Sequence, residues 1–304
     1  MVLLRPDARR RADQAWAVLR MSRPWFWPLG WAGAYAGSVL ATRGWLPPGA
    51  AVPRTVAALV VLGPLVWGAV LAVNDLHDLP SDRRNPRKVT APLVTGLLTE
   101  ADLVRWQTGA AVAALALAAA VGPGFVAGTA AVLLLGWLYS VPPVRLKTRP
   151  GLDVAVNALA VGVLAPMAGW SLHRPVTGYP VLVALLGLLL VAALYLPTTV
   201  LDVDADAAAG DTTAAVHWTP RVCRRAGLAL WVTATAVWLI SCHLDLLVRR
   251  DSWALQTAWA PVLVAGYAVA VRRPSIPRMA AVCLLFAVPA ADFLLAWVAA
   301  GRPS

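Results

Sequence analysis

Two short clusters of aspartates carry the most evident chemistry in the sequence. Together they hold seven of the 15 acidic residues, which are Asp75, Asp78, Asp82, Asp202, Asp204, Asp206 and Asp211. In the first cluster Asn74, Asp78 and Asp82 are spaced four residues apart, so a helix would place them on one face. Carboxylate oxygens are the ligands that Mg²⁺ prefers, and Mg²⁺ commonly bridges them to the phosphate oxygens of a substrate. We therefore predict a magnesium and diphosphate site whose metal ligands are Asp75, Asp78, Asp82, Asp202 and Asp206.

A simpler interpretation of such acids is that they cap helices or mark a solvated boundary. One aspartate at the end of an apolar run would fit that interpretation. Here the spacing of the first cluster is repeated by Asp202 and Asp206, in a chain with a single glutamate. So many carboxylates at the edge of a lipid phase would repel one another without a cation. The repetition favours the metal site, and Asp204, turned aside from the second stripe, is a further candidate metal ligand or base.

Basic residues that could bind a diphosphate follow another apolar run. The end of this run reads Tyr139-Ser-Val-Pro-Pro-Val-Arg-Leu-Lys147. The two prolines end the helix, which leaves Arg145 and Lys147 at the membrane surface. Arginine can bind phosphate oxygens through two N–H groups, and lysine binds them as a point charge. Arg23 and Lys88 are further candidates, and the alternative role for all four is the ordinary placement of positive charge on one side of a membrane.

The elements that position these residues are long apolar segments. The chain is 60% hydrophobic and only 13% charged, which excludes a disordered chain, a coiled coil and almost any soluble enzyme. Uncharged runs lie at 24–42, 55–74, 106–144, 154–173, 175–201, 226–244, 252–271 and 279–291. The run 106–144 is too long for one membrane span, and Gly122-Pro123-Gly124 divides it. We expect an all-α, polytopic membrane protein with about nine transmembrane helices in one bundle around a central cavity.

The loop charges predict the orientation of this bundle. Of the 26 lysines and arginines, 20 fall on the side that receives the N-terminal segment 1–20, and that side is therefore expected to be cytoplasmic. Both aspartate clusters lie at the same side. We expect a multi-pass protein of the cell membrane, with a transmembrane domain at 21–301 and a site that opens to the cytoplasm. The lipid bilayer is an expected partner. Nucleic acid is not, because the net charge of +11 is spread over short loops.

Three motifs resemble those of the UbiA superfamily of intramembrane prenyltransferases. Asn74-Asp75-Leu-His-Asp78-Leu-Pro-Ser-Asp82 resembles its NDxxDxxxD motif, and the segment from Asp202 to Thr213 is similar to its second aspartate motif. The segment 139–147 is similar to the family's YSxPPxRLK segment, and Arg23-Pro24 opens the first span as in many members. One departure is Ala91-Pro92-Leu93, where the family usually has Arg-Pro-Leu.

The resemblance implies a reaction and a set of roles. A prenyl diphosphate would be bound through Mg²⁺, and the metal and the basic residues would stabilise pyrophosphate as the leaving group. A lipophilic acceptor would then capture the allylic carbocation. The catalytic residues would be Asp78, Asp82, Asp202 and Asp206. The residues that bind the diphosphate would be Asn74, Tyr139, Arg145, Lys147, Arg23 and Lys88.

The acceptor is left open by the sequence. An aromatic acid or quinone precursor is the first expectation. Transfer to a lipid, carotenoid or tetrapyrrole, or cyclisation of the prenyl chain as in a terpene cyclase of this family, are the alternatives. Richness in alanine and arginine favours a bacterial source with a GC-rich genome. A CDP-alcohol phosphotransferase would carry its acids in one stretch, and a transporter would carry its charges in mid-span, so both are less favoured.

Three polar residues outside the motifs also lie in apolar segments. Asp153 and Asn157 begin one span, where Asp153 could cap the helix or face a cavity. Asp292 lies inside the last span, where hydrogen bonding within the bundle is the expected role.

Overall fold

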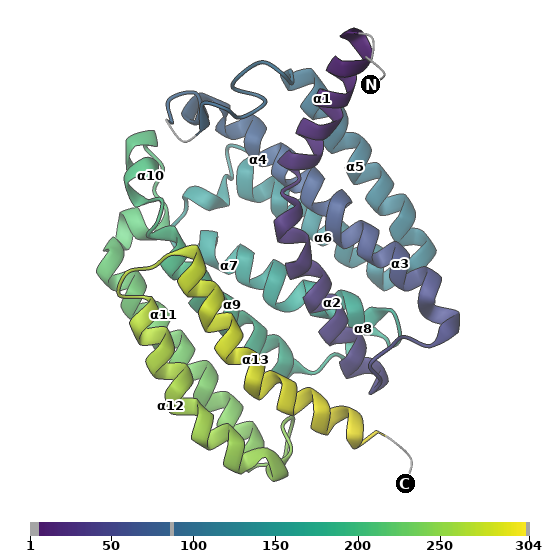
Figure 1. The fold of residues 1–304 in the computed structure, drawn as a ribbon, viewed down its shortest axis with the longest axis vertical. Coiled ribbons are helices and arrows are strands. Elements are labelled where there is room, and N and C mark those ends of the chain that lie inside the picture. The colour runs from purple at the N-terminus through teal and green to yellow at the C-terminus, as the bar shows by residue number, and fades with distance from the viewer. Residues whose placement is uncertain (1–5, 86–87, 302–304) are drawn as a thin grey trace, which may run out of the picture. The chain divides into compact units, whose positions relative to one another are not determined.

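The computed structural model describes residues 6–85 and 88–301, and all regular structure in these two ranges is helical (Figure 1). The α-helices are α1 (Pro6–Met21), α2 (Trp27–Thr42), α3 (Val52–Val60), α4 (Val66–Asp82), α5 (Glu100–Val121), α6 (Pro123–Ser140), α7 (Leu152–Leu159), α8 (Ala165–Ser171), α9 (Val181–Thr199), α10 (Val203–Ala209), α11 (Ala214–His243), α12 (Trp253–Ala270) and α13 (Ile276–Ala299). A π-helical turn at Val61–Leu65 joins α3 to α4, and another at Ala160–Leu164 joins α7 to α8. The all-α membrane fold predicted from the sequence is therefore confirmed.

Within residues 6–85 and 88–301, eight helical segments are long and apolar enough to cross a membrane. They are Gly49–Asp82, Glu100–Val121, Pro123–Ser140, Leu152–Ser171, Val181–Thr199, Ala214–His243, Arg250–Ala270 and Ile276–Ala299. The division of the run 106–144 is confirmed, because α5 ends at Val121 and α6 begins at Pro123.

The remaining span of the expected nine corresponds to α2, which has 16 residues. It is shorter than the apolar run 24–42 because Pro24–Phe26 form a separate 3₁₀ turn. At a rise of 1.5 Å per residue, α2 is about 24 Å long, less than the hydrocarbon core of a typical bilayer.

The chain forms two compact units. Unit 1 contains residues 1–32 and 52–145, and unit 2 contains residues 33–51 and 146–304. In unit 1, α4 packs against α5 and α6, and a Cβ added at Gly136 of α6 would lie 2.6 Å from a methyl carbon of Val70. Ala17 and Met21 of α1 pack with Leu79 and Leu103 in the core of this unit. The first aspartate cluster therefore lies on a helix of unit 1 that packs against both α5 and α6.

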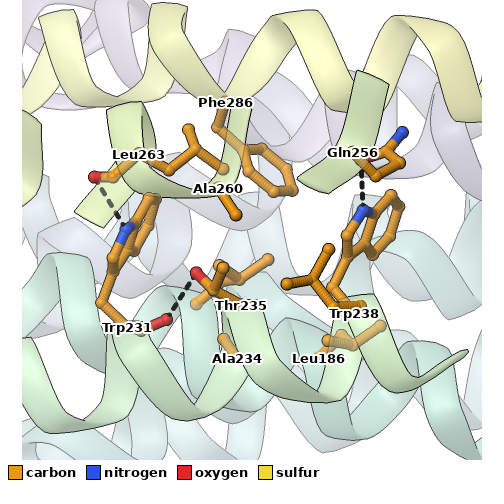
Figure 2. Close-up of a pocket in the computed structure, with 11 residues that line it drawn as sticks. Leu186, Trp231, Ala234, Thr235, Trp238, Gln256, Ala260, Leu263 and Phe286 are labelled. Atoms are coloured by element: carbon orange, nitrogen blue, oxygen red, sulfur yellow. Dashed lines mark hydrogen bonds between the residues drawn. The ribbon is translucent and has the colours of Figure 1, made fainter. Parts of the chain in front are cut away.

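In unit 2, α9 packs against α7 and α11, and α12 packs between α11 and α13 (Figure 1). Figure 2 shows Trp231 of α11 donating to the Leu263 carbonyl at 3.2 Å, and Trp238 donating to the Gln256 side chain at 2.7 Å. The space enclosed by these side chains is about 10 Å³, which is about one water molecule. This part of unit 2 is a packed core and has no room for an isoprenyl chain.

The polar groups in this core satisfy one another. Gln256 is 2% exposed and donates to Asp292 at 2.8 Å and to the Pro289 carbonyl at 3.2 Å. The predicted role of Asp292 in hydrogen bonding between helices is confirmed.

Candidate active site

The first aspartate cluster occupies the last turns of α4. The helix runs through Pro80 to Asp82, and Asn74 donates its amide N–H to Asp78 Oδ2 at 3.0 Å. A bond between residues four apart places both side chains on one face, as the spacing predicted. Ser140, the last residue of α6, donates to the Asn74 amide oxygen at 3.4 Å. The amide of Asn74 is therefore held by contacts to α4 and α6 of the same unit.

Each aspartate of this cluster has a basic partner of its own. Arg23 lies 3.2 Å from Asp75, Arg145 lies 3.2 Å from Asp78, and Lys88 lies 3.3 Å from Asp82. The aspartate side chains are only 12–18% exposed, whereas those of the three bases are 28–36% exposed. Carboxylates withdrawn from water in this way need compensating charge. Three of the four predicted cationic residues are thus brought to the first cluster.

The two arginines of this set have an unusual backbone conformation. Arg23 has a φ of 50° and Arg145 a φ of 37°, in the left-handed region that non-glycine residues seldom adopt. Both follow the end of a helix, α1 for Arg23 and α6 for Arg145. Residues held in this region cost of order 1–3 kcal/mol and cluster at functional sites. Tyr139 is half-buried in the last turn of α6.

The second aspartate cluster lies in unit 2, on a short helix of its own. The cluster follows the span that ends at Thr199 in α9, and α10 begins separately at Val203. Asp202 stands just before α10, and its carbonyl accepts the first backbone hydrogen bond, from Asp206 N at 2.8 Å. Asp204 is exposed, whereas Asp206 is half-buried and accepts a hydrogen bond from the Thr213 hydroxyl at 3.0 Å. The chain breaks at 200–202 because Asp202 leaves the helical region, with a φ of −109° and a ψ of 3°.

The electrostatics of unit 2 centre on Asp206. The pKa of Asp206 is raised to about 6, chiefly by burial and also by the neighbouring charges of Asp202 and Asp211, against the opposing effects of the Thr213 hydrogen bond and the Lys147 charge. Lys147 lies in the 3₁₀ turn Leu146–Thr148 and is 8% exposed. The structure therefore assigns Lys147 to the second cluster and Arg145 to the first, although the sequence suggested that the two act as a pair.

The donor atoms of each cluster suit a hard cation. The first offers three carboxylates and an amide oxygen, and the second offers two carboxylates beside a hydroxyl, all of which are oxygen ligands of the kind that Mg²⁺ takes. Within residues 6–85 and 88–301, no three acidic, histidine or cysteine side chains converge tightly enough to form a metal site by themselves. Mg²⁺ usually binds through one or two carboxylates and completes its shell with water and substrate oxygens, so the residues present fit such an ion.

Two contacts of the site were not predicted from the sequence, the hydrogen bond of Thr213 to Asp206 and that of Ser140 to Asn74. The only sequence signal for either residue is its position inside a motif. Neither histidines nor cysteines enter the two clusters in the described part of the chain.

Comparisons with known proteins place this chain in the class of intramembrane prenyltransferases. The sequence model of the UbiA prenyltransferase family matches residues 30–286, so the chain belongs to this family.

A curated relative, the lycopene elongase/hydratase of Halobacterium salinarum, is 33% identical over 205 residues, which are 64% of this chain and 66% of that protein. A UbiA homologue from Archaeoglobus fulgidus, solved with DMAPP and Mg²⁺, has a TM-score of 0.72 and 24% identity. That comparison covers 93% of this chain and 99% of the solved one. A digeranylgeranylglyceryl phosphate synthase has a TM-score of 0.69 and 14% identity, with 94% and 98% covered. At these identities the solved structures establish the fold.

Proposed function

We propose that this protein transfers an isoprenyl group from a prenyl diphosphate to a lipophilic acceptor and releases pyrophosphate, with Mg²⁺ as cofactor. The observation that carries the proposal is the set of three ion pairs at the end of α4, where each motif aspartate has a separate base. A diphosphate with bound Mg²⁺ presents negative oxygens and positive metal together. When this ligand binds, the aspartates can therefore bind the metal. The arginine and lysine side chains that had paired with these aspartates can then bind the phosphate oxygens.

The roles follow from the contacts. Asp75, Asp78, Asp82, Asp202 and Asp206 would hold Mg²⁺, and Asn74 would orient Asp78 through its 3.0 Å hydrogen bond. Arg23, Lys88, Arg145 and Lys147 would bind diphosphate oxygens, with Tyr139 as a neutral partner. When bound, Mg²⁺ would stabilise the charge that develops on the leaving oxygen.

The reaction balances without a redox partner. The allylic C–O bond breaks and its electron pair leaves with pyrophosphate, while the allylic carbon accepts an electron pair from the acceptor. The cation formed on the acceptor then either loses a proton or adds a water molecule, which releases a proton to leave a hydroxyl group. Once bound to the diphosphate oxygens, the bases of each cluster would compensate the charge that develops on the departing pyrophosphate.

For the acceptor we propose a carotenoid-type polyene, because the relative that matches 33% over 205 residues is a lycopene elongase/hydratase. An aromatic acid or quinone precursor, the first expectation from the sequence, is the alternative. That relative is archaeal, and a bacterial source for this chain stays a prediction. We further propose that the enzyme lies in the cell membrane with both aspartate clusters on the cytoplasmic side.

The test uses the purified protein in lipid nanodiscs with Mg²⁺ and either DMAPP or geranyl diphosphate. Lycopene and a hydroxybenzoate are offered separately as acceptors, and products are identified by mass spectrometry while pyrophosphate release is measured. We expect prenylated lycopene and stoichiometric pyrophosphate. If prenylated hydroxybenzoate is the sole product, the acceptor is an aromatic acid and not a carotenoid. If no combination of prenyl diphosphate and acceptor releases pyrophosphate, the proposed function is wrong.

A further inference from the structure

Asp153 is a carboxylate buried in unit 2 that the proposed reaction does not use. It lies in the first turn of α7 and is 1% exposed. Its Oδ1 accepts hydrogen bonds from the backbone N–H groups of Gly151 and Val154, both at 2.9 Å. Its Oδ2 accepts a third, from the backbone N–H of Ala214 at 2.9 Å. One oxygen therefore caps its own helix, while the other binds a residue 61 positions further along the chain.

Capping accounts for only half of this arrangement. A helix cap needs one side-chain oxygen and is normally at the surface, where a carboxylate keeps its water. Burying the carboxylate costs free energy that must be compensated by hydrogen bonds. The bond to Ala214 N is one of these, and it satisfies the first N–H of α11, which otherwise has no partner inside its own helix. The side chain thus joins the starts of two helices, α7 and α11.

The junction lies between a segment of the second aspartate cluster and the segment that carries Lys147. Ala214 directly follows Thr213, whose hydroxyl donates to Asp206. On the other side, Asp153 follows the turn Leu146–Thr148 that carries the buried Lys147. The carboxylate therefore links the segment of the second aspartate cluster to the segment of its lysine.

Two further contacts tie the same segments together. The Thr212 hydroxyl donates to the Thr148 carbonyl at 2.5 Å. Gly151, with a φ of 88°, lies so close under the Trp218 ring that an added Cβ would be 2.9 Å from it. Three contacts thus fasten residues 148–153 to residues 212–218.

We infer that Asp153 is a positioning residue, which holds the segment 202–213 against the segment of Lys147 so that Asp206 and Lys147 are placed before substrate binds. This inference rests on the proposed function, since it assigns the positioned groups to Mg²⁺ and diphosphate. Residues that orient metal ligands typically change metal affinity by 10- to 100-fold when they are replaced. Asp153→Asn should change the metal affinity in this way. Its amide keeps one oxygen for the N–H groups of Gly151 and Val154 but turns an NH₂ group towards the N–H of Ala214, which then loses its acceptor.

The experiment compares the wild type, Asp153→Asn and Gln256→Leu in nanodiscs. Binding of geranyl S-thiolodiphosphate, an analogue that does not turn over, is measured by calorimetry over a range of MgCl₂ concentrations. Backbone hydrogen exchange is followed by mass spectrometry in peptides that cover residues 202–218. Gln256→Leu is the matched control, because Gln256 is also a buried, hydrogen-bonded polar residue of unit 2 but contacts neither segment.

For Asp153→Asn we expect the Kd of the analogue at fixed MgCl₂ to rise by about 10- to 100-fold, with faster exchange in 202–218. Gln256→Leu should lower the Tm and change neither quantity. If Asp153→Asn fails to fold, Thr212→Val tests the same junction, because Thr212 is exposed and its replacement leaves no buried gap.

The outcomes separate the inference from the proposed function. An analogue Kd in Asp153→Asn equal to that of the wild type would overturn the positioning role and leave the proposed function standing. Equal losses of affinity in Asp153→Asn and Gln256→Leu would also overturn it, since the effect would then be general destabilisation. A wild type that binds no analogue at any MgCl₂ concentration would overturn the proposed function, and the inference with it.

Discussion

At the scale of single residues, the first cluster is a set of three acids whose charge is matched by three bases from different parts of unit 1. The partners come from before α2, from the loop after α4 and from the end of α6. Because the aspartates are less exposed than their partners, the bases are the groups that can leave the pair and follow a diphosphate. Replacing an aspartate of a pair therefore tests metal binding, whereas replacing its basic partner tests diphosphate binding.

Asp78→Asn in the first cluster and Asp202→Asn in the second should each abolish turnover while the protein stays folded. An amide oxygen is a poorer ligand for Mg²⁺ than a carboxylate, and the negative charge that balances the metal is lost. Pyrophosphate release and the Tm are measured together, with EDTA and added MgCl₂ as a second arm. Asp251→Asn, in an exposed surface pair with Arg249, is the control and should keep full activity. Full turnover in EDTA would refute the assignment of these acids to a metal.

Arg145→Ala should raise the KM for the prenyl diphosphate or lower kcat. A lost hydrogen bond between charged groups is worth about 1.5–3 kcal/mol, so kcat/KM should fall roughly 10- to 150-fold. Arg145→Lys should recover only part of this, because lysine lacks the planar pair of N–H groups that binds two phosphate oxygens side by side.

The matched control for Arg145 is Arg105→Ala, since Arg105 also pairs with an aspartate of unit 1 but is 78% exposed on its side chain. Steady-state kinetics with varied prenyl diphosphate provide the comparison. If Arg145→Ala changes membrane insertion but leaves these kinetics untouched, the residue determines topology alone.

The residue types at the site could be predicted from the sequence, but their partners could not. Asn74, Asp78 and Asp82 lie in one helix, so their common face follows from the helical repeat. The pairing of Asp75 with Arg23 and of Asp78 with Arg145 joins residues 52 and 67 positions apart. Such pairs depend on how helices pack and on the left-handed backbone of both arginines, which no local pattern indicates.

At the scale of the elements, glycine decides how closely helices approach. In unit 2 an added Cβ at Gly162, in the π-turn between α7 and α8, would collide with the carbonyl of Gly187 on α9, and the reverse also holds. Close approach at small residues is a common way for membrane helices to associate. The long helix Leu152–Ser171, which begins beside Asp153, is therefore fixed to α9 at its middle.

Gly162→Ala should lower the stability of the protein by about 1–3 kcal/mol, because the methyl group meets backbone atoms that cannot rotate away. Thermal unfolding in nanodiscs measures the effect as a lower Tm. Gly128→Ala on α6 is the control, since an added Cβ there meets nothing within 4 Å, and its Tm should be unchanged or slightly higher. Equal Tm values for the wild type and Gly162→Ala would show that this contact does not stabilise the fold.

The boundaries of these elements were predictable where the breaking residues are strong. Gly122-Pro123 ends one helix and starts the next, as expected. The break before α10 has no such signal, because Val200, Leu201 and Asp202 contain neither glycine nor proline. The length of the first span was overestimated for a related reason. Trp25 and Phe26 are apolar and extend the hydrophobic run, but they belong to a 3₁₀ turn before α2.

At the scale of the whole molecule, the distribution of charge sets the orientation in the membrane. With 20 of 26 lysines and arginines expected on one side, the positive-inside rule predicts that this side is cytoplasmic. If the proposed function holds, this prediction also gives the side on which pyrophosphate would be released, because both aspartate clusters are predicted on the same side from their order in the chain.

Labelling of single cysteines tests the orientation. The parent variant is Cys283→Ala, since Cys283 is exposed whereas Cys223 and Cys242 are buried. Into it we introduce Arg84→Cys, Arg221→Cys or Arg174→Cys, all at exposed positions. A membrane-impermeant maleimide added to intact cells should label only Arg174→Cys, because residue 174 follows the span Leu152–Ser171 and is expected on the side opposite to the positive loops. In inside-out vesicles it should label Arg84→Cys and Arg221→Cys instead. The reverse pattern would invert the topology, and pyrophosphate would then have to leave on the outer side, where the cell supplies no prenyl diphosphate.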